Sequence, residues 1–216
     1  MKAQTKKITV ENILLREAAE WRLISLFFEC PVGDWQNQVK DLAAEIGDKK
    51  LKKAAKLAEI EAGEGLYHSI FGPGGPAPAR EVTYRSWVQP GFLLSELAAF
   101  YKAFSYQPKT DEVPDHIAVE TGFIAYLKLK EAFANESDDP ENMQITAEAA
   151  QKFIELHLAK FVEAITKSLA ESGIEYLALA SAALFERVGS DKDRKIRQIL
   201  PVLGEMDEEF FECGLV

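Results

Sequence analysis

Apolar residues recur along most of the chain at steps of three and four positions, the spacing of one face of an α-helix. The first such stretch covers 13–28 and is followed by Pro31. A second stretch follows Asp34, a residue suited to cap a helix, and stops at Gly47. No run of alternating apolar residues bounded by hairpin turns occurs, so the pattern predicts an all-α fold.

The middle of the chain combines one further helix with a proline-rich loop. Helical spacing continues from 51 to 71 and predicts a third helix there. Residues 71–78 then contain three glycines and three prolines, a composition that predicts a loop. Helices are expected to resume near Pro90 and near Pro114, with each proline in the first turn.

The last third predicts a polar connection followed by more helices. Residues 135–142 are polar, and we expect a linker or flexible loop there. Thr146 is expected to cap a long helix that Gly173 closes. The next helix is expected over 174–188, and a short one from Ser190 and Asp193 to Pro201.

Composition and charge restrict the function classes. The 216 residues are 47% hydrophobic and 28% charged, which fits a single all-helical domain over 1–216. The net charge of −10 disfavours binding to nucleic acids and anionic membranes, and suits a partner that carries Lys or Arg.

The two cysteines and the chain's N-terminal residues indicate a compartment. Cys30 and Cys213 form no CxxC pair, which argues against a Cys-based zinc site, a thioredoxin-like motif and an iron–sulfur cluster. Residues 1–7 are charged rather than apolar, and no apolar run is long enough to span a bilayer. We therefore expect a soluble cytoplasmic protein.

The chemistry-bearing residues have to be judged singly. The sequence has no P-loop, no dinucleotide fingerprint, no Gly-x-Ser-x-Gly and no His-Glu-x-x-His. His68 is expected on the surface near a helix end, and His157 is expected as a hydrogen-bonded core residue. His116 differs from both, because it follows Glu112 at a helix entry and precedes Glu120 by one turn.

Several interpretations of residues 112–120 remain open. The carboxylates could stabilise the helix N-terminus, or Asp115 and Glu112 could form a recognition corner that accepts hydrogen bonds from an incoming cation. His116 and Glu120 could also hold a metal, but two ligands are fewer than the three usual for catalytic zinc. A phosphate at the helix N-terminus near Pro114 is disfavoured by the neighbouring acidic residues.

Four motifs occur together in a fixed order. They are Tyr67-x-x-Ile70-Phe71-Gly72-Pro73-Gly74, Glu81-x-x-Tyr84, Glu112-x-Pro114-Asp115-His116-Ile117-x-x-Glu120-x-x-Phe123, and Phe153-x-x-x-His157-Leu158-x-x-Phe161. In this order and helical setting, the chain resembles the TorD/DmsD/NarJ family of molybdoenzyme maturation chaperones. Gly122, in the third motif, is expected to mark close helix packing.

The resemblance implies a cytoplasmic chaperone with a TorD-like helical bundle and no catalytic activity. Such a chaperone binds the twin-arginine signal or N-terminal segment of a DMSO-reductase-type molybdoenzyme. It holds this client for cofactor insertion and then assembly or export. The chaperone is expected to carry no cofactor, since the molybdopterin belongs to the client, and a guanine nucleotide is the alternative ligand. It would be a monomer or a swapped homodimer.

The resemblance also implies site residues and a hinge. A hinge near 107–114 would separate an N-terminal from a C-terminal half. The residues expected to bind the leader are Glu112, Pro114, Asp115, His116, Glu120, Tyr67, Phe71, Gly72, Pro73, Gly74 and Tyr84. The alternative function is a helical adaptor or nucleotide-binding protein without a molybdoenzyme client.

Overall fold

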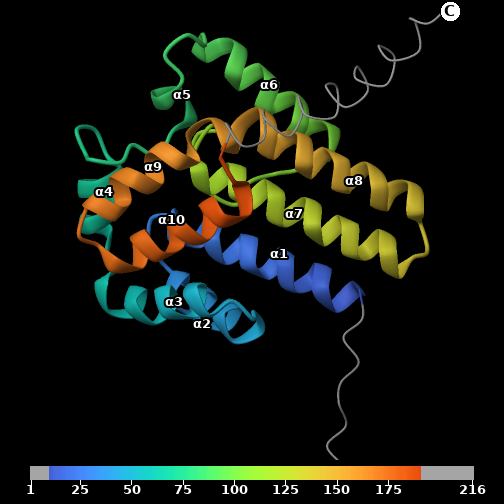
Figure 1. The fold of residues 1–216 in the computed structure, drawn as a ribbon, viewed down its shortest axis with the longest axis horizontal. Helices are drawn as coiled ribbons and strands as arrows, with labels where there is room; N and C mark the ends of the chain where they lie inside the picture. The colour runs from blue at the N-terminus through green and yellow to red at the C-terminus, as the bar shows by residue number, and fades with distance from the viewer. Residues whose placement is uncertain (1–9, 191–216) are drawn as a thin grey trace, which may run out of the picture.

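The computed structural model describes residues 10–190 and confirms the all-α prediction (Figure 1). Within these residues there is no strand, only an isolated bridge between Arg80 and His116. In chain order the elements are α1 (Val10–Phe27), α2 (Trp35–Glu45), α3 (Lys49–Glu61), α4 (Glu64–Phe71), α5 (Glu81–Tyr84), α6 (Pro90–Ala103), α7 (Ile117–Glu136), α8 (Pro140–Phe153), a π-helical turn η1 (Ile154–Leu158), α9 (Ala159–Glu171) and α10 (Glu175–Val188).

The helices pack around α7, which lies between α1 and α8 (Figure 1). On the other side of α1 are α2 and α3, while α10 packs against both α3 and α9. The short α5 rests on α9. None of the helices in the described part combines the length and the apolar character needed to cross a membrane.

The core is rich in aromatic residues, and its most extensive helix–helix contact is between α1 and α7. Phe27, Phe123 and Phe153 are fully buried. A Cβ on Gly122 of α7 would lie 2.7 Å from the Tyr106 hydroxyl and 3.2 Å from Ser25 Oγ of α1. The expectation that Gly122 marks close packing is therefore confirmed.

One boundary and one cap in the first half differ from the predictions. The expected helix over 51–71 is divided into α3 and α4, because Ala62 and Gly63 both adopt extended backbone. Asp34 precedes α2 as expected, but its side chain makes no capping hydrogen bond to the helix. It accepts instead from the Asn37 side chain at 2.6 Å.

The start of α7 also differs from the prediction. Pro114 is not in its first turn, because the helix begins at Ile117 and His116 occupies the cap position. The segment between α6 and α7 is irregular and contains residues 107–114. Movement of that segment as a hinge stays a prediction.

The expected polar linker over 135–142 is largely helical. The α7 helix runs to Glu136, and α8 begins at Pro140, where Asp139 caps it by accepting from the Asn142 amide at 3.0 Å. Thr146 is therefore not a cap. It lies inside α8 and its hydroxyl donates to the carbonyl of Asn142 at 2.7 Å.

The long helix expected to end before Gly173 is interrupted by one π turn. This turn, η1, separates α8 from α9 and carries His157. The following helix, α10, ends before Gly189 as predicted, and Gly189 has a φ of 72°. The short helix predicted from Ser190 to Pro201 extends beyond the described residues, and Cys213 lies outside them.

Candidate functional site

The end of the proline-rich loop and the Pro-Asp-His segment lie next to each other. The Glu81 amide donates to the Asp115 carbonyl at 2.8 Å, and the Ile117 amide donates to the Ala79 carbonyl at 2.8 Å. These bonds flank the isolated bridge between Arg80 and His116. The structure thus brings together motifs that are more than thirty residues apart in sequence.

The Asp115 carboxylate forms a salt bridge with an arginine of its own chain, Arg80. The Asp115 side chain is fully buried and accepts from Arg80 Nε at 3.0 Å and from Arg80 Nη2 at 2.9 Å. The Val82 amide also faces this carboxylate at 3.4 Å. The predicted role of accepting an incoming cation is therefore not available to Asp115 here, because the carboxylate fastens the loop instead.

His116 caps α7 with its own ring. Nδ1 accepts from the Ala118 amide at 3.2 Å, and Nε2 lies 3.2 Å from the Tyr67 hydroxyl. The residue is 4% exposed, and this burial lowers its pKa although Glu112 nearby opposes the shift. A neutral ring with its proton on Nε2 satisfies both contacts. The helix N-terminus is thus already capped and buried, which leaves no open phosphate site there.

Tyr67 links His116 to the surface. Its hydroxyl donates to Glu112 Oε1 at 2.6 Å, and Glu112 Oε2 lies 3.7 Å from His116 Nε2. Burial and the hydrogen bond to Glu112 raise the pKa of Tyr67 well above its ordinary value. The Glu112 side chain is 29% exposed, so it is the carboxylate of this motif that a partner can reach.

Three carboxylates surround Tyr67 and Cys30, and we call Glu29, Glu64 and Glu112 the acidic corner. Partial burial raises the pKa of the Cys30 thiol, and the charges of Glu64 and Glu112 raise it further. Glu29 and Glu112 act in the same direction on Tyr67. The corner therefore has a negative potential that favours a cation.

Glu120 lies inside the protein beside Glu81 and is fully buried. Glu81 accepts from Arg85 at 2.6 Å and lies 3.0 Å from His157 Nδ1. Burial and the charge of Glu81 raise the pKa of Glu120 well above its ordinary value. Glu120 is therefore not exposed to a client in this structure, and its predicted place in the leader groove is not seen.

The metal interpretation of His116 and Glu120 is not supported either. Both ring nitrogens of His116 face other groups, and one of them accepts an amide proton. Among the described residues, the group with metal-ligand spacing consists of Cys30, Glu64 and His68.

The remaining motif residues pack in the core or shape the proline-rich loop. Phe71 is 8% exposed and packs against Phe28 and Tyr67, with ring centroids 6.0 and 5.2 Å apart. Gly72 ends α4, Pro73 follows it, and Gly74 has a φ of 82°. Tyr84 stacks on Phe161 with ring centroids 5.8 Å apart. Phe71 thus supports Tyr67, whereas Tyr84 packs on α9 and its buried hydroxyl has no hydrogen-bond partner among the described residues.

The other two histidines lie where they were expected. The side chain of His68 is 62% exposed near the end of α4, where Glu64 precedes it by one turn. His157 is fully buried and its Nδ1 is paired with Glu81.

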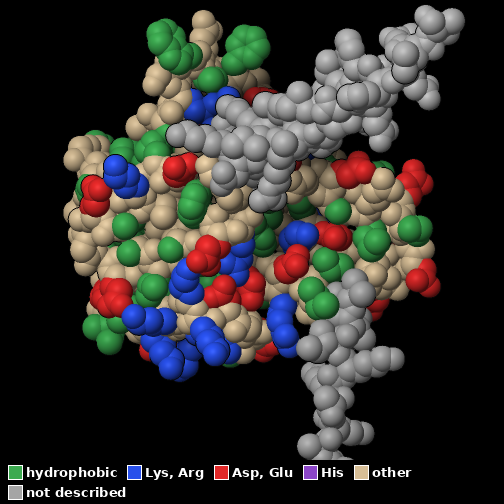
Figure 2. All heavy atoms as spheres, in the orientation of Figure 1, with side chains coloured by type: hydrophobic (Ala, Val, Ile, Leu, Met, Phe, Trp, Pro, Cys, Tyr) green, Lys and Arg blue, Asp and Glu red, His purple; other side chains and the backbone are tan. Residues whose placement is uncertain are grey.

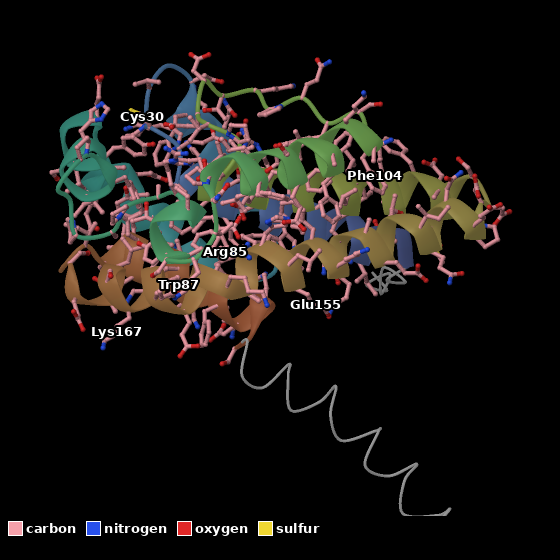
Figure 3. The ribbon with its side chains drawn as sticks, turned by 90° about the horizontal axis from the view of Figure 1, so that it is seen from above. Cys30, Arg85, Trp87, Phe104, Glu155 and Lys167 are labelled. Carbon is pink, nitrogen blue, oxygen red and sulfur yellow. The ribbon has the colours of Figure 1, made fainter. Side chains whose placement is uncertain are left out.

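An apolar groove crosses the outer surface of α7. It consists of two adjoining cavities of about 620 and 810 Å³ that share Tyr126 and Leu129 as lining residues. The first cavity is lined mainly by Leu15, Ala18, Ala19, Arg22, Leu42, Ser105, Tyr106, Gln107, Lys109, Gly122 and Ala125. Besides the two shared residues, the second is lined by Ala103, Phe104 (labelled in Figure 3), Lys130, Phe133, Ala134, Ser137, Asp139, Asn142, Ile145 and Thr146.

The groove was not predicted, although the sequence contains a signal for it. Leu129 and Phe133 stand one turn apart on a helix whose opposite side is already apolar. They are 37% and 57% exposed, and Ile145 across the groove is 46% exposed. The groove also meets the acidic corner, because Arg22 lines the first cavity and pairs with Glu29 at 2.5 Å.

Comparison with known proteins identifies the family of this chain. The family described as "Nitrate reductase delta subunit" matches residues 36–167, more than half of the chain. The chain belongs to this family. A curated relative, the "Selenate reductase assembly chaperone protein" of Thauera selenatis, is 34% identical over 117 residues. That match covers 53% of this chain and 58% of the relative.

Membership of the delta-subunit family confirms the resemblance to molybdoenzyme maturation chaperones. The matched residues contain the motifs up to Phe161 and two carboxylates of the acidic corner, Glu64 and Glu112. They begin after α1, so Cys30, Glu29 and the α1 side of the groove precede them.

Proposed function

We propose that this delta-subunit family member is an assembly chaperone for a DMSO-reductase-type molybdoenzyme, and that it binds the twin-arginine signal or N-terminal segment of that client. It performs no catalytic step, and the molybdopterin belongs to the client. The proposal is carried by the apolar groove that ends at the acidic corner. The family and the name of the curated relative support the assembly role.

The groove and the corner match the two parts of such a leader. An apolar helical segment would lie along Tyr126 and Leu129, in the manner of helix-in-groove recognition. The arginines that precede it would meet Glu112 and its neighbours at the corner. This division moves the binding role from the buried Asp115 and Glu120 to surface groups.

Most of the affinity has to come from apolar contact. Ion pairs at an exposed rim contribute only about 0–1 kcal/mol each, whereas apolar burial contributes about 25 cal/mol per Å² before ordering costs. Adding apolar burial and weak ion pairs and subtracting the ordering costs, we expect dissociation constants in the low micromolar range, on the order of 1–10 μM. Moderate affinity suits a chaperone that has to release its client.

Titration with a leader peptide tests the groove. The probe is a synthetic peptide with two arginines followed by an apolar helical segment, and the variants are Leu129→Lys and Phe133→Lys. Each should weaken binding by at least about tenfold, because a charge then faces the apolar segment. Phe92→Lys is the matched control, since Phe92 is 78% exposed on α6 and outside the groove. Equal peptide affinity in all three variants would refute the proposal that the leader binds in the groove.

The acidic corner is tested separately. Glu112→Gln should weaken binding of the arginine peptide by a few-fold, about 0.5–1 kcal/mol, and should not affect a peptide without the arginine pair. Glu171→Gln is the control, because Glu171 is exposed at the end of α9. If both peptides lose affinity equally, Glu112 supports the fold rather than recognising the arginines.

A further inference from the structure

Three different metal-ligating side chains meet at the acidic corner. Cys30 follows α1, while Glu64 and His68 are one turn apart on α4. The Cys30 sulfur, a carboxylate oxygen of Glu64 and a ring nitrogen of His68 all lie within 4.8 Å of one another. Figure 3 shows Cys30 beside the teal α4 helix.

The separations are close to those of a tetrahedral zinc site. Zinc bonds of about 2.3 Å to sulfur and 2.0–2.1 Å to nitrogen or oxygen place neighbouring ligand atoms about 3.3–3.6 Å apart. His68 Nε2 and Glu64 Oε1 are already 3.9 Å apart, and their side chains are 62% and 67% exposed. Because both side chains are exposed, their rotamers are free to adjust toward these distances.

The ligand types select the class of cation. A thiolate and an imidazole favour borderline-soft divalent ions over magnesium or calcium, and a carboxylate completes the three protein ligands of an open zinc site. Glu29 and Glu112 add negative charge close by. Arg22, which lies beside Glu29, is paired with it at 2.5 Å.

We propose that Cys30, Glu64 and His68 bind a zinc-like divalent cation, with the fourth position open to water or to a donor atom of a partner. The site joins the connection after α1 to α4. His68 also neighbours Tyr67, whose hydroxyl bonds to Glu112, so an ion here would occupy the corner proposed for the leader arginines. The metal proposal does not depend on leader binding.

Cobalt titration of the full chain tests the site directly. Wild-type protein should bind one Co²⁺ ion with the near-ultraviolet absorption of a thiolate–cobalt bond, and Zn²⁺ should displace it. Cys30→Ser should abolish this absorption, whereas Cys213→Ser should retain it. His68→Ala should weaken Zn²⁺ binding, measured by competition with a chromophoric chelator, by at least about tenfold.

Thermal melts without metal check that the variants fold. Zn²⁺ should raise the melting temperature of wild type and Cys213→Ser, and should not raise that of Cys30→Ser. Cobalt–thiolate absorption that persists in Cys30→Ser, or Zn²⁺ affinity unchanged in His68→Ala, would overturn the assignment. These measurements contain no peptide, so failure of the leader proposal cannot be mistaken for failure of the metal site.

Discussion

Glu120 holds a fully buried carboxyl group beside the Glu81 carboxylate, and the two groups can share a hydrogen bond only when one of them is protonated. The neighbouring Glu81 carboxylate makes its ionisation still less favourable, so the pKa of Glu120 is raised in the folded protein. The unfolded chain, in contrast, ionises this group near its ordinary pKa of 4.5. A buried acid of this kind makes stability depend on pH.

Glu120→Gln should therefore be more stable than wild type at neutral pH. Between pH 4.5 and the raised pKa, the folded state holds a proton that the unfolded state has lost, so wild-type stability falls as pH rises. Glutamine removes this titration. The advantage of the variant should grow by up to about 1.4 kcal/mol per pH unit across that window.

Urea unfolding at several pH values measures this gap. Glu171→Gln changes an exposed carboxylate, so its difference in unfolding free energy from wild type should not grow comparably with pH. A stability difference between Glu120→Gln and wild type that stays constant from acidic to neutral pH would show that folding does not raise the pKa of Glu120.

At the scale of elements, the contact between α1 and α7 depends on a missing side chain. Gly122→Ala places a methyl group against the Tyr106 hydroxyl and Ser25 Oγ, and should destabilise the protein by about 1–2 kcal/mol. The helix propensity of alanine, worth about 1 kcal/mol, only partly offsets this cost. In a Tyr106→Phe background the nearest clash is absent, so the same substitution should cost less.

A double-mutant cycle by chemical unfolding gives the coupling between the two positions. Gly91→Ala in α6 is the matched control, because a Cβ there meets no atom within 4 Å. It should be neutral or slightly stabilising. If Gly122→Ala costs the same in both backgrounds, the Tyr106 hydroxyl is not what limits the approach of the helices.

The four-residue helix α5 is too short to be stable alone and is fixed by Glu81. Glu81→Ala leaves Arg85 and His157 without their shared carboxylate, and should cost about 3–5 kcal/mol of unfolding free energy. It should also expose the segment around α5 to limited proteolysis. Glu96→Ala, an exposed position on α6, should change neither property. A loss below about 1 kcal/mol would mean that packing alone holds α5.

Helices are predicted correctly from the sequence where their signals lie within a few residues of one another. Helical spacing and terminating glycines act within a few residues, so α1, α6 and α10 were found. Polar helix ends on the surface resemble a loop, so the sequence predicts a linker over 135–142 although most of this stretch is helical. The division near Gly63 was missed because apolar spacing continues across it.

The candidate site depends on contacts that no local pattern contains. The motifs gathered as expected, but Arg80 reaches Asp115 from 35 positions away and makes it an internal partner. Cys30 comes close to His68 because the residues after α1 pack against α4, as Phe28 does against Phe71. Burial of Glu120 likewise follows from tertiary packing rather than from its place on a helix.

For the binding of a basic peptide, the distribution of charge over the molecule matters more than the net charge of −10. Lysine and arginine side chains gather over α2 and α3 at the lower edge of Figure 2. Some of them pair with α10, as Lys53 does with Glu175 at 2.5 Å. In the acidic corner, Arg22 pairs with Glu29, whereas Glu112 accepts from the uncharged Tyr67 hydroxyl.

Association of the twin-arginine peptide should therefore slow as salt is added. Raising ionic strength from about 0.02 to 0.5 M should lower the association rate by about tenfold, because screening removes long-range attraction. Dissociation, governed by apolar contact, should change little. Stopped-flow mixing measures both rates. A peptide with the same apolar segment and no arginines should show a much weaker salt dependence, and matching slopes for the two peptides would contradict electrostatic steering.

The π turn between α8 and α9 has a consequence for comparing relatives. A π turn accommodates one extra residue without disturbing the helices on either side. A protein that lacks one residue within 154–158 can therefore close this turn as regular α-helix and keep both flanking helices in phase. A one-residue deletion elsewhere in α8 or α9 would rotate every following side chain by about 100°. Alignment gaps in this stretch are thus expected to collect at η1.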